Sequence, residues 1–465
     1  MKNILGHGPW WWLLLVLTIG QKAGAQEIAA PADLPKDQFE FMGRASTNIQ
    51  MFQRALLPGP AGAIVDQQFM APIHTSLSAR AVGIDTPVGK DSLQIQVAAF
   101  GQLVPGADDA VRPATWDVSS AFIEQRWKSV GLTLGRQVVA GGAARYSRLD
   151  GAQLAVRSPH FELAGYGGLT VMPRWNQQYG YHHLGDGYED WSTNPEASRN
   201  VERLDQWMAG ARARMFHSKV GSAGVSIHQQ AEQGSLYRST LGLEGSLTAV
   251  PRLDLNVDAL FNTDSRRFSD VRLAAMVQAW DHPQGGLTIR GEFLHTLPSA
   301  LLSQSSVLSV FSYEEISEAG GEVALGLPGN VTLEASGYAQ MMNEGSPGLR
   351  TQLGARLKYG ELHPLMARLV VGRLKSEENG YFTVRSSLSY VLSQTVTLLA
   401  DLYFYRYDQL IADVRFSSFY AAHVAYQASR RWSARIGSSL TQSPYARFDL
   451  QALAKVTYEF DVRGQ

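Results

Sequence analysis

The sequence predicts an all-β fold, a transmembrane antiparallel β-barrel of about 20 strands, with 18–22 as the expected range. Three observations lead to this prediction. The first residues have the pattern of a secretion signal, the remainder contains no apolar segment long enough for a membrane-spanning helix, and many segments of strand length alternate apolar with polar residues.

The first residues have the pattern of a cleaved signal peptide. Lys2 is the only lysine or arginine among the first twenty residues, and an apolar run follows from Trp10 to Ile19. Ala23-Gly24-Ala25 then supplies the small residues that signal peptidase prefers. The apolar run is shorter than the roughly 20 residues of a membrane-spanning helix, so cleavage after Ala25 is favoured over a permanent anchor.

Composition excludes several other classes of protein. The chain has 465 residues, no cysteine and a formal net charge of −1. Without cysteine it can have neither a lipid anchor on cysteine, nor a disulfide framework, nor a cysteine-based metal site. The nearly neutral charge argues against a nucleic-acid partner. No charge block or low-complexity linker divides the chain. Either a soluble all-β protein or a membrane barrel remains.

The period of two is clearest near the C-terminus, in Phe448–Phe460. One face of this segment is wholly apolar and ends in aromatic residues, whereas the other is mostly polar. The same alternation recurs in Trp207–Met215, Leu253–Phe261, Val271–Ala279, Leu349–Tyr359, Phe382–Tyr390 and Val396–Phe404. Tilted strands of about 9–11 residues cross a bilayer, and lipid cannot satisfy an open sheet edge, so the sheet must close.

The connections between these segments are of two lengths. Short turns are expected at Ala249–Pro251, Pro328–Gly329, Gly360–Leu362 and Leu392–Gln394, on the periplasmic side. The longest segments, Trp175–Asp205 and Leu297–Ile316, are expected to be extracellular loops or lumen constrictions. Phe39–Arg54 and Leu77–Ile84 are the two weakest strand candidates.

These features divide the chain into four parts. Residues 1–25 form the signal peptide, 26–76 a short N-terminal segment that can supply a first strand, 77–460 the outer-membrane barrel and 461–465 a periplasmic tail. The apolar face of the last strand ends at Phe460, which is similar to the C-terminal aromatic signal of outer-membrane proteins, although Asp461–Gln465 follow it. This signal implies outer-membrane lipid and the barrel-assembly machinery as partners.

A family resemblance is found in Val130–Leu169. The stretch contains Leu132-Thr133-Leu134-Gly135-Arg136-Gln137, then Gly141-Gly142, then Asp150-Gly151. It resembles the alginate-export and porin-like family of bacterial outer-membrane barrels. From the residues alone, a bulge at Gly135 would turn Arg136 toward the lumen. Asp150 lies across the hairpin from Arg136, and the alternative is that the two form a structural ion pair that fixes the loop.

The resemblance implies a lumen that conducts a glycan. The residues that we expect to line the pore are Arg136, Asp150, Arg212, Arg214, Arg238, Arg272, Arg290, Arg356, Arg385, Asp401, Tyr403, Arg406 and Arg435. Further carboxylates on the inward parity, such as Glu244 and Glu334, make the lumen mixed in charge rather than strongly basic. A mixed lumen suits a neutral or mixed-charge glycan. Tyr403 and Tyr405 can stack on sugar rings or simply pack against the wall.

No pattern predicts catalysis, a metal or a cofactor. Tyr179–Trp191 contains two histidines and three carboxylates, but their spacing matches no metal motif. No nucleophile stands beside a base in the arrangement that hydrolysis requires. We therefore expect neither an enzyme nor a bound metal or cofactor.

Three functions remain open. The first is an outer-membrane pore that exports a polysaccharide with the help of a separate periplasmic polysaccharide-export protein, since the chain itself has no large periplasmic domain ahead of the barrel. The second is a general or substrate-specific porin for small-solute uptake. The third is a non-conducting scaffold or adhesin barrel, or the barrel of an outer-membrane enzyme.

Overall fold

The computed structural model describes most of the barrel wall. The residues described are 39–58, 64–87, 89–103, 114–171, 206–232, 235–248, 250–282, 285–297, 315–342, 346–361, 363–376, 379–411, 413–442 and 449–463. The predicted signal peptide, the predicted loop Trp175–Asp205, the stretch Tyr179–Trp191 and nearly all of Leu297–Ile316 lie outside these residues.

Strands make up almost all of the described chain. They are β1 (Glu40–Pro58), β2 (Ile64–Met70), β3 (Ile73–Thr86), β4 (Gly89–Leu103), β5 (Ala114–Trp127), β6 (Val130–Ala140), β7 (Tyr146–Arg157), β8 (Phe161–Thr170), β9 (Gln206–His217), β10 (Gly221–Glu232), β11 (Ser235–Leu247), β12 (Leu253–Asn262), β13 (Arg267–His282), β14 (Gly285–Thr296), β15 (Ile316–Leu327), β16 (Val331–Met342), β17 (Ser346–Tyr359), β18 (Leu365–Ser376), β19 (Tyr381–Val391), β20 (Val396–Ile411), β21 (Val414–Gln427), β22 (Trp432–Gln442) and β23 (Asp449–Arg463). A short 3₁₀ helix, η2 (Gly142–Ala144), lies between β6 and β7. Among the described residues, no helix is long and apolar enough to cross a membrane.

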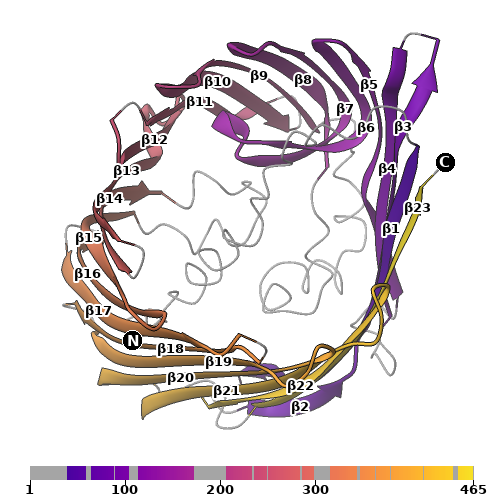
Figure 1. Ribbon diagram of the computed structural model, residues 1–465. Helices are drawn as coiled ribbons and strands as arrows, with labels where there is room; N and C mark the ends of the chain where they lie inside the picture. Colours follow the sequence, from indigo (N-terminus) through magenta and orange to yellow (C-terminus); the bar gives the residue numbers. More distant parts are fainter. Residues whose placement is uncertain are drawn as a thin grey trace, which may run out of the picture.

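The strands form one closed antiparallel sheet (Figure 1). Each strand from β3 onward pairs with the next, and β1 closes the ring by pairing with β23 on one side and β3 on the other. β2 pairs with the distal half of β1 and leads directly into β3, so the two occupy one position in the ring. The 23 strands therefore occupy 23 − 1 = 22 positions. The predicted all-β barrel is confirmed, with a strand number at the top of the expected range.

The barrel reaches further than residues 77–460 at both ends. β1 lies within the N-terminal segment 26–76, and β23 continues to Arg463. β1 was a weak candidate because small or polar residues, including Gly43 and Thr47, interrupt its apolar face. The structure supplies the reason at Gly43, where the ring of Phe460 occupies the space that a side chain would need. The aromatic ring on β23 thus fills the space that the glycine of β1 leaves on the outer face.

The two ends of the barrel differ. Glu40 and Arg463, at the start of β1 and the end of β23, lie opposite each other and define what we call the turn end. The predicted turns at Pro328–Gly329 and Leu392–Gln394 are at this end. The long connections from β8 to β9 and from β14 to β15 start from the opposite end, which we call the loop end.

The outer face of the wall is apolar, as the alternation predicts. Large hydrophobic side chains stand exposed on alternate positions of nearly every strand, with Leu353 on β17 exposed by 67%. Their neighbours in sequence, such as Gln352, point to the inside. A soluble protein rarely leaves so continuous an apolar surface uncovered, so this surface indicates a wall that faces lipid.

The register of the wall can be tested at Leu353 and Gln352. Replacing Leu353 by Arg places a charge on the outer face near the middle of β17, which should destabilise the barrel in lipid vesicles by about 2–4 kcal/mol. Gln352→Arg is the matched control, because the same charge then meets the water-filled side. Urea titration of the two refolded variants measures the difference. Equal stability of the two would mean that the assigned faces are wrong.

Candidate functional site

The β6–β7 hairpin leaves the wall and enters the lumen. Pairing between β5 and β6 stops at Ala121 and Arg136, although both strands continue beyond this point. β6 remains paired with β7 as far as Ala140 and Tyr146. The tip of the hairpin, with η2, then contacts β10, β11 and β12. Figure 1 shows this end of the hairpin curling inside the ring. We call residues 140–146 the inward tip.

Glycine permits the bend. Gly135 has a φ of 117°, a conformation that L-residues rarely adopt, and a side chain there would collide with the carbonyl oxygen of Ala121. Gly135 pairs with Gly151, which in turn pairs with Gly168, so a line of glycines crosses β6, β7 and β8. Backbones can approach closely along this line, and the sheet turns inward there.

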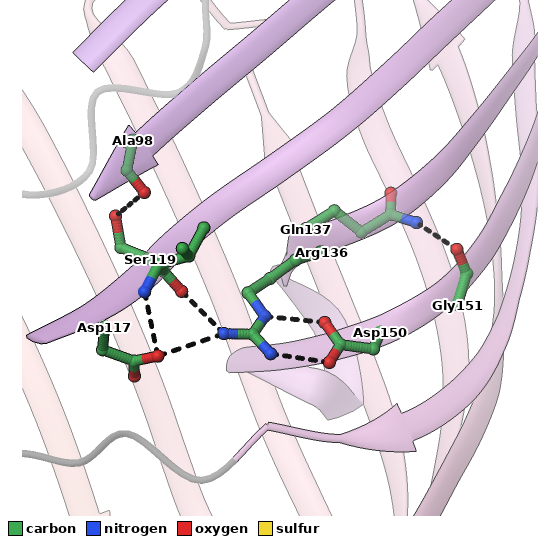
Figure 2. A network of polar contacts seen from close by, with 8 residues as sticks. Ala98, Asp117, Ser119, Arg136, Gln137, Asp150 and Gly151 are labelled. Carbon is green, nitrogen blue, oxygen red and sulfur yellow. Dashed lines mark hydrogen bonds and ion pairs between the residues drawn. The ribbon is translucent and has the colours of Figure 1, made fainter. Parts of the chain in front are cut away.

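Arg136 closes the gap where β5 and β6 separate (Figure 2). Its Nε and Nη2 atoms donate to the two carboxylate oxygens of Asp150, each at 2.7 Å. Its Nη1 donates to the backbone oxygen of Val118 at 2.8 Å and to Oδ1 of Asp117 at 3.2 Å. The guanidinium thus supplies a donor to a carbonyl group on the strand edge that β6 has left.

This geometry decides between the two roles expected for Arg136. The register of β6 and β7 is unbroken at Gly135, so the predicted bulge is absent. Arg136 pairs with Ala121 and belongs to the same row as Val97, which faces outward. Its side chain is only 13% exposed. Arg136 and Asp150 therefore act as a structural clamp that holds the hairpin, and the expectation that Arg136 lines the pore is wrong.

Polar contacts fix the inward tip to the wall at β10–β13. The backbone nitrogen of Ala143 donates to Oγ of Ser226 at 2.8 Å, and Oγ1 of Thr240 donates to the carbonyl of Ala143 at 3.2 Å. Arg145 reaches the carboxylates of Asp258 and Asp270 at 2.7 and 3.0 Å. The tip is therefore held by both hydrogen bonds and ion pairs.

A small apolar core lies beneath the inward tip. Val139, Ala144, Leu149 and Met208 are buried together, with Tyr166 packed against them. Beside this core, the hydroxyl of Tyr166 lies 2.8 Å from Nδ1 of His228, which is fully buried. Burial on this scale is unusual inside a water-filled barrel, and it makes the tip a packed part of the fold.

Arginines and carboxylates pair along the inner wall from β9 to β18. The ion pairs are Arg212 and Arg214 with Glu244, Arg145 and Arg272 with Asp270, Arg290 with Glu292, Arg350 with Glu318, and Arg356 and Arg368 with Glu334. At three places two arginines share one carboxylate. We call this set the arginine track.

In the part of the arginine track from β13 to β18 the carboxylates are less exposed than the guanidinium groups, whereas Glu244 is nearly as exposed as Arg212 and Arg214. The side chain of Arg272 is 39% exposed, whereas that of its partner Asp270 is 2% exposed. On β18, Arg368 is 49% exposed and Glu334, on β16, only 13%. The surface that water meets inside the barrel is therefore richer in positive charge than the balanced composition suggests.

Three of the other predicted pore residues lie on the inner face of the wall. Arg238 lies opposite Gln230, Asp401 opposite Ser387, and Arg435 opposite Lys455. These positions follow from the register and place all three on the inner wall.

The aromatic residues on the inner wall pack against one another. Tyr403 lies with its ring 5.5 Å from that of Phe419, and Tyr405 meets Tyr381 edge to face at 5.6 Å. The guanidinium of Arg385 lies 5.8 Å from the centre of the Tyr405 ring. Because Tyr405 is only 7% exposed, its ring is used for packing and is not free to stack on a sugar.

Arg406 does not line the pore. It lies directly opposite Phe382 on β19 and Phe416 on β21, and both phenylalanines are exposed on the outer face. Strict alternation puts Arg406 on the same face as Phe404. A charge is tolerated there because the position is close to the loop end of β20, where a membrane's apolar layer would end.

The sequence did not reveal Arg145 or Asp117. Arg145 follows the Gly141-Gly142 pair, and nothing in this glycine-rich loop indicates a partner for the charge at its end. Asp117 faces Arg136 only because the hairpin bends inward. Neither contact has a signature in local sequence spacing.

Comparisons with known proteins add little. No family model matches the sequence, and no curated protein matches it. Solved structures similar to the chain include OccAB2 of Acinetobacter baumannii (9% identity over 90% of this chain and 98% of that chain, TM-score 0.44) and OccK9 (OpdG) of Pseudomonas aeruginosa (10% identity, 91% and 98%, TM-score 0.42). The translocation pore of the P pilus usher PapC is also similar (9% identity, 90% and 99%, TM-score 0.45). These values are too low to transfer a function, and they give no support to alginate export in particular.

The clamp can be tested by replacing Arg136 with Gln. This leaves Asp117 and Asp150 without their cation in a largely buried place, and it should cost about 3 kcal/mol of unfolding free energy. Arg126→Gln is the control, because Arg126 pairs with Glu124 near the turn end of β5 and is more exposed. That change should cost less than about 1 kcal/mol. Urea unfolding in vesicles would contradict the clamp if the two losses were equal.

Proposed function

We propose that this protein is an outer-membrane channel for small anionic solutes. The observation that carries the proposal is the arginine track, in which guanidinium groups cover their carboxylate partners on the inner wall. A small anion can approach the exposed nitrogens of an arginine that already shares its carboxylate with a second arginine. A cation meets carboxylates that are buried behind those groups.

The membrane placement is supported by the shape and the outer face of the barrel. A barrel of 16–18 strands already leaves an aqueous channel, and this ring has 22 positions. Its apolar outer surface fits lipid. The predicted signal peptide would direct the chain out of the cytoplasm, and cleavage after Ala25 remains a prediction.

The inward tip would narrow the channel. It extends from β6 and β7 to β10, β11 and β12 along the inner wall, and hydrogen bonds and ion pairs hold it there. A solute must therefore pass beside this packed hairpin, whose Arg145 itself belongs to the arginine track. Such an arrangement suits small molecules that move singly.

Glycan export, the first function proposed from the sequence, has less support. A polysaccharide chain needs a continuous wide path, whereas the inward tip is packed on an apolar core within the lumen. The paired carboxylates would also oppose a long polyanion at several points. Uptake or release of small solutes is the simpler use of this lumen. A non-conducting scaffold would give no function to the exposed guanidinium groups of the arginine track.

Ion selectivity provides the main test. The purified protein is placed in a planar bilayer with a KCl gradient, and the reversal potential is measured. We expect a preference for chloride that falls toward equality in the double variant R356Q/R368Q, which removes two exposed cations. R430Q/R431Q removes two cations from the turn between β21 and β22 and should keep the preference. A wild-type barrel that conducts nothing, or that prefers potassium, would overturn the proposal.

The role of the inward tip can be tested at Arg145. Arg145→Gln removes both ion pairs to Asp258 and Asp270 and leaves the other arginines of the arginine track in place. We expect single-channel current that is larger and noisier, because the tip loses its strongest attachment to the wall. Arg157→Gln, which breaks an exposed pair with Glu162 at the turn end of β7, is the control. Identical current in both variants would show that the tip does not limit flow.

A further inference from the structure

Arginine and phenylalanine alternate in one row across the outer face near the loop end. Arg373 on β18 pairs with Phe382 on β19, Phe382 with Arg406 on β20, and Arg406 with Phe416 on β21. Directly opposite residues in an antiparallel sheet share a face, so all four side chains are on the same side. Phe382 and Phe416 are exposed there. We call this set the Arg–Phe row.

The charge of the row is positive. Nη1 and Nη2 of Arg373 donate to the two carboxylate oxygens of Asp408 at 2.8 and 2.6 Å. Arg406 and Arg415 are exposed and lie within electrostatic reach of the same carboxylate. Two further guanidinium groups thus lie within electrostatic reach of the carboxylate that Arg373 binds. Arg373 is held in place by Asp408, and Arg406 adds an exposed positive charge to the row.

The outer face directly below the row is apolar. Two residues further toward the turn end, Val371 pairs with Val384 and Val384 with Phe404, on the same face as the row. The ring of Phe404 stacks on that of Phe416 at 5.7 Å. On β18, β19 and β20 the cations therefore border an apolar surface.

We propose that the Arg–Phe row binds the phosphate of a phosphorylated outer-leaflet lipid. The guanidinium groups of Arg406 and Arg373 would hold the phosphate, since their planar donors match its oxygens. Phe416 and Phe404 would contact the upper part of an acyl chain. The inference depends on the proposed membrane placement and not on conduction. It commits to a lipid because the cations border the apolar wall on its outer face, where a bilayer brings phosphate and acyl chain together.

The experiment measures lipid binding by the full-length protein in detergent micelles. Bisphosphorylated lipid A is the probe, with dephosphorylated lipid A and inorganic phosphate as comparisons, and native mass spectrometry gives the bound fraction. We expect clear binding of the bisphosphorylated lipid and much weaker binding of the other two. The double variant R373Q/R406Q should weaken binding by about tenfold, because each charge-assisted bond to phosphate is strong. R430Q/R431Q makes the same change of charge at the turn end and should bind like the wild type.

Each outcome bears on the proposal. Equal weakening in the two double variants would mean that net charge alone attracts the lipid, and the site would be rejected. Equal affinity for inorganic phosphate would show a simple anion patch and would also reject the lipid. Circular dichroism and the heat-dependent gel shift confirm that the variants are folded. Channel current is measured on the same R373Q/R406Q sample and should be unchanged, so failure of the channel proposal and failure of the lipid site are told apart.

Discussion

The contact on which the interior of this barrel depends is the clamp between Arg136, Asp117 and Asp150. A closed sheet has no natural place for a hairpin to leave the wall, because each strand that departs exposes the backbone of its neighbour. Here one guanidinium satisfies the edge of β5 and holds β7 at the same time. The glycines along the bend make the departure possible, and the clamp makes it stable. The inward tip, its apolar core and its contacts with β10–β12 all follow from that departure.

A second feature of the interior is that ion pairing between arginines and carboxylates does not make the inner surface electrically neutral. Along the inner wall, arginines and carboxylates are mixed, and the sequence therefore predicts a lumen of mixed charge. The structure orders the two signs by depth, with Asp270 and Glu334 below Arg272 and Arg368. Carboxylates are short and arginines are long, so a strand that places both on one face sorts them in this way. What a solute meets is therefore determined by side-chain length as well as by composition.

Periodicity was sufficient to predict the wall. A period of two with apolar residues such as Leu353 on one parity implies a barrel and assigns its outer face, because lipid imposes that rule on each strand independently. It was less informative for β1, whose Gly43 is explained only by contact with Phe460 of β23 and whose Thr47 hydroxyl lies 3.2 Å from that of Thr75 on β3. Periodicity could not predict the inward hairpin. The pairing of Gly135 with Gly151, which allows the bend, is visible only in the folded sheet. Arg406 was misplaced although its parity, shared with Phe404, already assigns it to the outside.

Closure by β1 and β23 has a consequence for the order in which the barrel forms. The first strand of the chain and the last are direct neighbours, separated by about four hundred residues of sequence. The pair cannot form until the whole chain is present, and its loop-closure entropy is the largest of any strand pair in the ring. The other neighbours are nearly all joined by local hairpins, which form early. Assembly is therefore expected to proceed as a growing curved sheet with two open edges, and its slowest step is the meeting of those edges.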